Sequence, residues 1–407
     1  MSTLSQFVGG NLPIGSMQFM PDVGWHALLA DTSEWLRTNT LISKSGYAAA
    51  AALEHMRAHL FTATAASAPQ SSVCLATNGS GTYVSVDGST VRGVQYSTDY
   101  GQTWTAVSTA TVAANIYNYV IYVVGIGFII GGNSTGNIYT QISADGITYG
   151  SQNNTAITGT SAANTVRLAY NGTLVIAANY DTTAAGVRMY SSPTGAAFTS
   201  RGITVNNTAF TLSAGPTGLV LVTTAGVASG VPYVSTDGIT YTNYAPGILT
   251  VYAGGVLGGV GCIVGLTSSN VSVYATTTGG AFGAPKPFGF MAGLPANAGN
   301  NNLNNYASVV GNRLVIPTTS GMAYTSDFVR WVTQDTSLGM YDASSGYVFA
   351  SDARGFVAVS TTNAGVSAYY ASSTIDNSNA IGRGIITASG VSGGGGPAGS
   401  IGYLRIK

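Results

Sequence analysis

The stretch YSTDYGQTW, residues 96–104, has the composition of a turn between two β-strands. Ser97 and Asp99 carry side-chain oxygens that can accept hydrogen bonds from backbone N–H groups a few residues further along the chain. Gly101 can adopt the positive φ that such a turn requires, and Trp104 can bury a large area between two sheets. We call this pattern the box and use it to search for internal repeats.

Six degenerate copies of the box follow the first one. They are ISADGITY (142–149), YSSPTGAAF (190–198), VSTDGITY (234–241), YATTTGGAF (274–282), YTSDFVRW (324–331) and the weaker YASSTIDN (370–377). The second residues of the seven boxes lie 40 to 50 positions apart, and they are Ser97, Ser143, Ser191, Ser235, Ala275, Thr325 and Ala371.

A second element shares this period, because an apolar run that contains or follows a glycine precedes each box. The runs are GTYVSV (81–86), GFIIGG (127–132), GTLVIAA (172–178), GLVLVTT (218–224), GCIVGLT (261–267), GNRLVIP (311–317) and GFVAVST (355–361). A period of about 46 residues, made of short β segments and turns, is typical of a β-propeller blade. The repeats predict an all-β fold with a seven-bladed propeller over residues 66–380, and the weak seventh box leaves six or eight blades open.

The first box resembles the Asp-box, or BNR, repeat of sialidases and related propellers. The matching residues of the first box are Ser97, Asp99, Gly101, Thr103 and Trp104. Copies that match with one residue fewer, or more loosely, contain Ser143, Asp145, Gly146, Ser235, Asp237, Gly238, Asp327 and Trp331. In that family the boxes lie on turns away from the catalytic face. The resemblance therefore implies a fold, with these residues in structural turns, and no activity.

The predicted propeller lacks most residues used for acid–base catalysis. The two glutamates, Glu34 and Glu54, and the three histidines, His26, His55 and His59, all precede residue 66. A sialidase-like enzyme needs a Tyr nucleophile activated by Glu, an acidic proton shuttle and three arginines that grip a carboxylate. We therefore expect no catalytic residues. The alternative is a sialidase-like or lyase-type depolymerase, which would require an Asp within reach of two Arg at the mouth of the central channel.

The N-terminal segment 12–56 resembles the collar-type domain of bacteriophage tail fibres. The resemblance is carried by Pro13 with Gly15-Ser16, by Gly24-Trp25 with Ala30-Asp31, and by Tyr47 at the start of an Ala-rich segment. The Gly-rich stretch 390–407 likewise resembles the ends of phage tail and fibre proteins, which often close on a short strand. Both resemblances imply a virion protein.

A helix is predicted over residues 46–61, with an apolar stripe suited to oligomerisation or docking. The stripe consists of Tyr47, Leu53, Met56 and Leu60. His55 and His59 stand four residues apart, a spacing that can chelate a metal. A solvated pair opposite the docking stripe explains them more simply, so we expect no metal and no cofactor.

Composition excludes several other functions. Lys+Arg and Asp+Glu are both 14, so nothing favours nucleic-acid binding. The apolar run 117–132 is too short to span a bilayer and predicts two buried strands joined near Gly125 and Gly127. Cys74 and Cys262 match no metal spacing and are expected to be buried free thiols. The N-terminus lacks the features of a secretory signal, which favours synthesis in a host cytoplasm.

The sequence thus predicts three parts. Residues 1–65 form a short α-containing attachment or oligomerisation module, residues 66–380 the propeller, and residues 381–407 a Gly-rich tail that ends in a strand. The predicted function is that of a structural virion protein of a phage tail or tail fibre that recognises a host-surface glycan or protein. We expect it to bind other virion proteins through residues 1–65 and to form a homo-oligomer. The sequence does not identify its receptor-binding residues.

Overall fold

The computed structural model describes an all-β arrangement of strands and turns, and the described residues contain no helix. They are 17–21, 35–37, 42–43, 62–66, 74–88, 91–101, 103–134, 136–157, 166–183, 186–205, 210–224, 232–248, 250–267, 272–278, 280–287, 307–310, 313–318, 321–329, 331–335, 347–351, 355–360, 368–372, 380–381 and 400–405. The chain divides into two units, residues 63–371 and residues 1–62 with 372–407. The helix predicted over 46–61, with its docking stripe and two histidines, lies outside the described residues.

The larger unit begins with three antiparallel sheets that follow one another along the chain. The first contains β5 (Cys74–Thr77), β6 (Tyr83–Val86), β7 (Val94–Ser97) and β8 (Thr105–Ala106). The second contains β9 (Tyr119–Val123), β10 (Gly127–Ser134), β11 (Asn137–Ser143) and β12 (Asn153–Ala156). The third contains β13 (Arg167–Tyr170), β14 (Val175–Asp181), β15 (Gly186–Ser192) and β16 (Thr199–Val205).

Four further sheets complete this unit. The fourth contains β17 (Phe210–Ala214), β18 (Val220–Thr224), β19 (Tyr233–Ser235) and β20 (Thr242–Asn243). The fifth contains β21 (Thr250–Leu257), β22 (Val260–Leu266), β23 (Ser272–Thr278) and β24 (Ala281–Phe282), with β25 (Lys286–Pro287) also paired to β23. The sixth contains β26 (Ser308–Val310), β27 (Arg313–Thr318), β28 (Gly321–Thr325) and β29 (Val332–Asp335), and the seventh contains β30 (Tyr347–Ser351), β31 (Gly355–Ser360) and β32 (Ala368–Ser372) with β4 (Thr62–Ala66). The glycine-associated apolar runs noted in the sequence form or overlap the second strand of every sheet.

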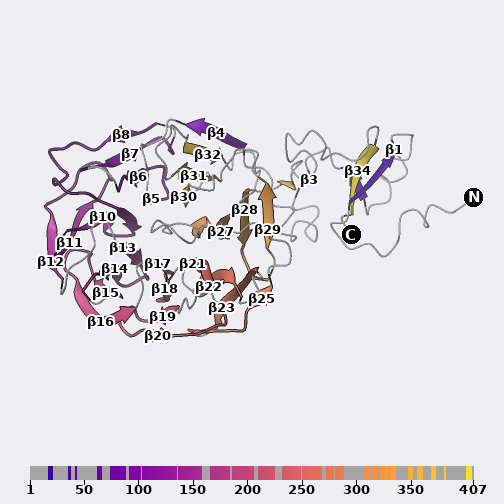
Figure 1. Ribbon diagram of the computed structural model, residues 1–407. Helices are drawn as coiled ribbons and strands as arrows, with labels where there is room; N and C mark the ends of the chain where they lie inside the picture. The colour runs from indigo at the N-terminus through magenta and orange to yellow at the C-terminus, as the bar shows by residue number, and fades with distance from the viewer. Residues whose placement is uncertain are drawn as a thin grey trace, which may run out of the picture. The chain divides into compact units, whose positions relative to one another are not determined.

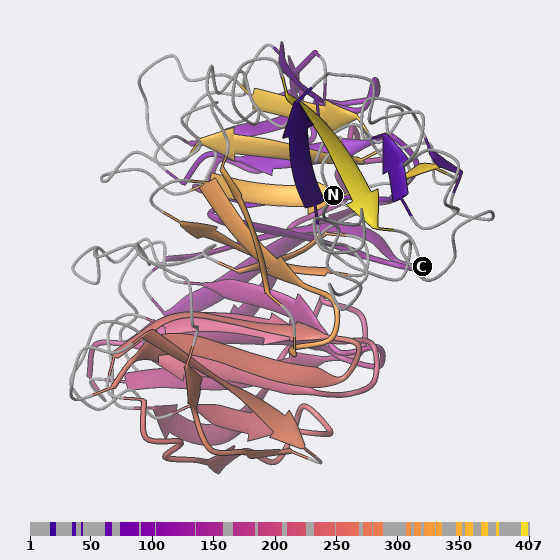
Figure 2. The ribbon, with the colours of Figure 1, turned by 90° about the vertical axis from the view of Figure 1, so that its right-hand side faces the viewer.

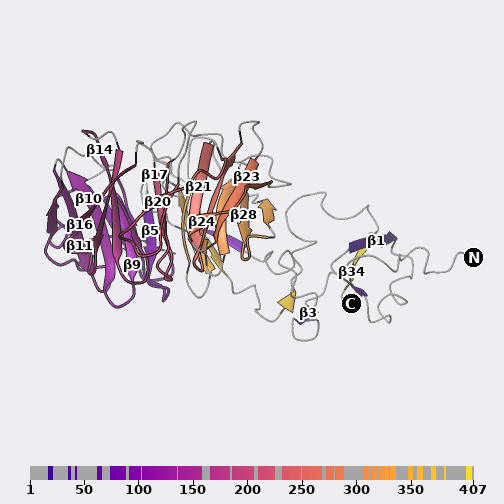
Figure 3. The same cartoon turned by 90° about the horizontal axis from the view of Figure 1, so that it is seen from below.

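The sheets are arranged in a ring, as Figure 1 shows. The first strand of each sheet contacts the first strand of the next, and β30 contacts β5, so the inner strands form a closed circle. Seen edge-on, the strands run roughly along the axis of the ring (Figures 2 and 3). Strand β4, from the start of the unit, is the outermost strand of the last sheet beside β32. The unit is a β-propeller.

The antiparallel order of strands gives the ring two distinct faces. Because direction alternates from strand to strand, the turns after the first and third strands of each sheet lie at one end. The boxes follow the third strand, so we call this end the box face. The inner strands begin at the other end, where the turns after the second strands also lie, and we call it the opposite face.

The apolar run 117–132 forms two antiparallel strands, as predicted from its sequence. Val123 of β9 pairs with Gly127 of β10. Phe128, Ile129 and Ile130 of β10 are fully buried on both sides of the sheet. A strand that is covered on both sides needs a continuous apolar sequence, which explains why the run resembles a membrane segment in composition. No described helix has the length and apolarity to cross a membrane.

The smaller unit combines strands from both ends of the chain. Strand β34 (Ser400–Arg405) lies between β1 (Met17–Pro21) and β2 (Trp35–Arg37) and is antiparallel to both. Strand β3 (Ile42–Ser43) pairs with β33 (Ala380–Ile381). The propeller is therefore inserted between two halves of this unit. The three-part division predicted from the sequence treated those halves as separate segments.

Candidate functional site

The box turns are closed by a small set of hydrogen bonds. In the second box, Ser143 Oγ donates to Asp145 Oδ1 and accepts from the Gly146 N–H, both at 2.8 Å. Asp145 Oδ1 also accepts from the N–H groups of Ile147 and Thr148, at 2.8 and 2.9 Å. The fourth box repeats these bonds with Ser235, Asp237, Gly238, Ile239 and Thr240. Serine and aspartate together thus bind three backbone N–H groups in the second box and four in the fourth, where the Asp237 N–H also donates to Ser235 Oγ at 3.3 Å.

The first box contains one residue more than the second and fourth boxes. It accommodates this residue because Tyr100 adopts a left-handed backbone conformation. Tyr100 has a φ of 65°, and the N–H of Gly101 then reaches Ser97 Oγ at 2.8 Å. Asp99 Oδ1 accepts from the N–H of Thr103 at 2.9 Å. The indole N–H of Trp104 donates to the Gly101 carbonyl at 3.1 Å, so the final aromatic residue also stabilises the turn.

The sixth box keeps the same turn with different residues. Thr325 Oγ1 accepts from the N–H of Phe328 at 2.8 Å, and Asp327 Oδ1 accepts from the N–H of Val329 at 2.8 Å. Phe328 occupies the glycine position with a φ of 56° and is 8% exposed. Trp331 packs against Tyr274 of the preceding sheet, with ring centroids 5.4 Å apart. The left-handed turn therefore persists without glycine.

The third box corrects the alignment of the repeats. Ser192 Oγ, and not that of Ser191, accepts from the N–H of Gly195, at 2.9 Å. Ser191 Oγ accepts instead from Arg201 Nε at 2.7 Å. The sequence places two serines side by side, and only the direction of each side chain distinguishes them. Since the residues of a strand alternate between its faces, the adjacent serine cannot replace the one that caps the turn.

The box glycines lie directly against the second strand of the preceding sheet. A Cβ atom added to Gly146 would lie 2.7 Å from Val84 Cγ2, and one added to Gly238 would lie 2.7 Å from Ile176 Cδ1. A Cβ atom added to Gly195 would lie 2.6 Å from Ile129 Cδ1. At these distances the neighbouring side chain would have to shift to accommodate a Cβ atom. The boxes therefore connect adjacent sheets, a structural role that needs no substrate.

The box aspartates make the propeller sensitive to acid. The N–H of Thr148 is the main cause that holds the pKa of Asp145 below its usual value. Burial opposes the shift at Asp237, but the N–H groups of Thr240 and Ile239 outweigh it and lower the pKa. A lowered pKa stabilises the folded state above the unfolded pKa of about 3.9, and this contribution is lost as the pH falls through the folded value.

We expect the Asp145→Asn and Asp237→Asn variants to lose about 1 kcal/mol each at pH 7, a modest value because both carboxylates are largely in contact with solvent. The difference from the wild type should shrink below about pH 4. Urea denaturation at several pH values measures it. A stability difference between wild type and variant that stays constant from pH 7 to pH 2 would show that the ionised carboxylates do not stabilise the box turns.

The centre of the opposite face contains a buried charge. Cys74, Tyr119, Arg167 and Phe210 are the first residues of the consecutive inner strands β5, β9, β13 and β17. Arg167 is 4% exposed, and its Cζ atom lies 5.8 Å from the ring centroid of Tyr119 and 5.7 Å from that of Phe210. The guanidinium group therefore lies between aromatic rings from the two neighbouring sheets.

Neighbouring residues do not neutralise this charge. Burial lowers the pKa of Arg167 to about 10, which leaves it protonated at neutral pH. Burial raises the pKa of the Cys74 thiol to about 11 and also raises that of the Tyr119 phenol, so both are neutral. No carboxylate pairs with Arg167 among the described residues. Two cation–π contacts contribute about 0.5 to 2 kcal/mol each, whereas burial of an unpaired charge costs several kcal/mol.

Two asparagines of the second sheet fix the start of β13. Asn118 Nδ2 donates to the Val166 carbonyl at 2.7 Å, and Asn133 Oδ1 accepts from the Val166 N–H at 3.3 Å. The same carbonyl accepts from Arg167 Nη1 at 2.9 Å. These contacts hold the arginine backbone and one of its nitrogens in place.

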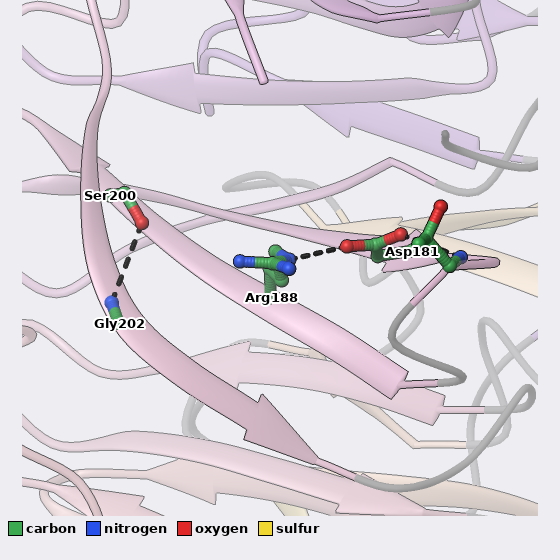
Figure 4. A network of polar contacts seen from close by, with 5 residues as sticks. Asp181, Arg188, Ser200 and Gly202 are labelled. Carbon is green, nitrogen blue, oxygen red and sulfur yellow. Dashed lines mark hydrogen bonds and ion pairs between the residues drawn. The ribbon is translucent and has the colours of Figure 1, made fainter. Parts of the chain in front are cut away.

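Four other arginines of the larger unit have separate partners. Arg188 Nε pairs with the buried Asp181 at the end of β14, as Figure 4 shows; this end of the strand lies on the opposite face. Arg92 Nη1 donates to the Thr109 carbonyl at 2.7 Å, and Arg313 lies 5.1 Å from the ring centroid of Tyr324. Arg201 is bonded to Ser191. Among these described contacts, no aspartate is shared by two arginines, which is the arrangement that the depolymerase alternative requires. Arg330 and Arg354 lie outside the described residues.

Sequence reasoning did not identify the position of Arg167. The available signal was that Arg167 is the one charged residue in the seven inner strands. Both cysteines are buried thiols that form no disulfide, as predicted. The described residues contain no group of three or more His, Cys, Asp or Glu side chains that could hold a metal ion.

Comparisons with known proteins add little to this geometry. Neither the protein-family models nor the curated proteins gave a match. Among solved structures, "YCF48 bound to D1 peptide" is similar with 12% identity and a TM-score of 0.48, over 78% of this chain and 99% of that one. The WD40 propeller domain of Doa1 is similar with 12% identity and a TM-score of 0.48, over 75% of this chain and 95% of that one. A six-bladed fungal lectin of Aleuria aurantia, described with a fucose recognition mode, is similar with 13% identity and a TM-score of 0.34. The match covers 56% of this chain and 81% of that one. With TM-scores this low, the assignment of the fold rests on the sheet order described above.

Proposed function

We propose that this chain is a structural protein of a bacteriophage tail or tail fibre, with a seven-bladed propeller that binds a glycan or protein on the host surface. The observation that carries the proposal is the pairing of β34 with β1 and β2. This pairing joins both chain ends in one small unit and leaves the propeller as an insertion. Such a plan suits a protein that is attached through one unit and presents the other.

Three features support this assignment. The resemblance of residues 12–56 to a tail-fibre collar domain and that of 390–407 to the ends of fibre proteins concern the unit that contains the chain ends. The box turns serve to hold sheets together, and Glu and His do not occur in 66–380. A rigid propeller without an acid–base pair is suited to binding and presentation. In this proposal the small unit binds other virion proteins, the chain forms a homo-oligomer, and the propeller has seven blades, a number that the seven sheets of the larger unit support.

The test uses the purified full-length chain and the phage that encodes it. Antibodies against the chain should label the tail or fibres in electron micrographs of intact particles. The chain should also bind host cells and block phage adsorption, whereas an unrelated propeller of similar size should not. Labelling without binding or blocking would leave only an architectural role. Absence of the chain from particles would overturn the virion assignment.

The depolymerase alternative has its own measurement. The chain is incubated with purified host-surface polysaccharide, and new reducing ends and unsaturated uronic products are measured over time. We expect neither to form. Release of either product would replace the binding role with an enzymatic one.

A further inference from the structure

One edge of the Arg167 guanidinium group has no hydrogen-bond partner within the part of the chain that the structure describes. Its Cζ atom lies 5.8 Å from the ring centroid of Tyr119 and 5.7 Å from that of Phe210, and Nη1 donates to the Val166 carbonyl. Nε is buried and has no hydrogen-bond partner among the described residues. Nε and Nη2 form the edge of the guanidinium group remote from Nη1. This edge can donate two parallel hydrogen bonds to one carboxylate.

We propose that Arg167 forms a carboxylate-binding site at the centre of the propeller, in which Nε and Nη2 donate to the two oxygens of a ligand carboxylate. A buried charge normally has a counter-charge or a hydrogen-bonded ligand. The neighbouring Cys74 and Tyr119 supply none, since both remain neutral at physiological pH. A bound carboxylate supplies the counter-charge and both acceptors together.

The surroundings favour a carboxylate over a phosphate. The site offers one positive charge, so a monoanion neutralises it, whereas a phosphate dianion would leave an excess of negative charge. The side chain is 4% exposed and Nε is buried, so a small planar group needs the least rearrangement of the neighbouring residues to reach this edge. The remainder of a larger ligand must then lie beyond the ring of inner-strand residues. Free carboxylic acids and sugar acids share this chemistry.

The site is held in position before the ligand arrives. Asn118 and Asn133 fix the backbone at Val166, the Val166 carbonyl accepts from Nη1, and two aromatic rings flank the guanidinium group. Preorganisation of this kind reduces the entropy lost on binding. The inference depends on these contacts alone and stands whether or not the chain is a virion protein.

The test is isothermal titration calorimetry of the full-length chain at pH 7 and constant ionic strength, with sodium glucuronate, sodium acetate and glucose as probes. We expect one glucuronate per chain and no binding of glucose. Arg167→Met should weaken glucuronate binding at least about tenfold, because it removes the charge and both donors. Arg167→Lys should also weaken it about tenfold, because an ammonium group cannot reproduce the two parallel bonds.

Arg201→Met is the matched control, since it removes the same charge from an arginine bonded to Ser191 and away from the centre. It should bind glucuronate like the wild type. Equal affinity for acetate and glucuronate would assign the site to free carboxylic acids, and tighter binding of glucuronate would assign it to sugar acids.

Three results would overturn the proposal: no binding of either carboxylate, equal binding of glucose, or an equal loss in Arg201→Met. Circular dichroism establishes whether each variant is folded. If Arg167→Met is unfolded, Arg167→Lys decides the question, because unchanged affinity in that variant contradicts a two-bond contact.

Discussion

The Gly127→Ala variant is expected to lose roughly 3 to 5 kcal/mol of folding free energy, from backbone strain and overpacking together. Gly127 begins β10 with a φ of 117°, a conformation that alanine rarely adopts. A Cβ atom there would lie 2.2 Å from the carbonyl oxygen of Ser143. That oxygen belongs to the backbone at the start of the second box, so it cannot move aside as a flexible side chain could.

Gly125→Ala is the control, since it lies in the same turn with a φ of 83° and has no atom within 4 Å of an added Cβ. It should lose only about 1 to 2 kcal/mol, the cost of a left-handed alanine. Urea denaturation followed by circular dichroism measures both variants. Equal midpoints for the two variants would show that contact with Ser143 is unimportant, and the close approach of the two turns would then be wrong.

The box and the apolar run, which recur in each repeat, could be predicted from sequence because their physical requirements are local. A box needs an oxygen acceptor and a residue that tolerates positive φ within a few positions, and Ser143 with Gly146 meet both needs. A strand buried on both sides needs a continuous apolar run, as in β10. These requirements recur with the period of the sheets, so even degenerate copies predicted the propeller.

Other features depend on residues far apart in the chain and could not be predicted. The pairing of Phe19 with Gly402 joins strands from opposite ends of the sequence, and no local pattern signals it. The position of Arg167 at the centre follows from the register of β13 against its neighbours. The choice of Ser192 over Ser191 depends on which side chain faces the turn. In each case tertiary contacts decide what the sequence leaves open.

The Ile176→Ala variant is expected to lose about 2 to 5 kcal/mol, because it creates a cavity where a box meets the preceding sheet. Ile176 of β14 is fully buried, and its Cδ1 atom fills the space in front of Gly238 in the fourth box. The control is Ile239→Ala, since Ile239 follows that glycine but is 43% exposed. This control should change stability by no more than about 0.5 kcal/mol. Thermal and urea denaturation measure both variants.

A double-mutant cycle tests the contact itself. Gly238→Ala alone adds a methyl group 2.7 Å from Ile176 Cδ1 to a residue with a φ of 74°. The Ile176→Ala background removes this contact, so the backbone strain and the 2.8 Å approach of the methyl group to Asn171 Nδ2 remain. The loss in the double variant should therefore be smaller than the sum of the single losses by about 1 kcal/mol or more. Strict additivity would mean that the box glycine and the neighbouring strand do not support each other, and the boxes would then stabilise only their own turns.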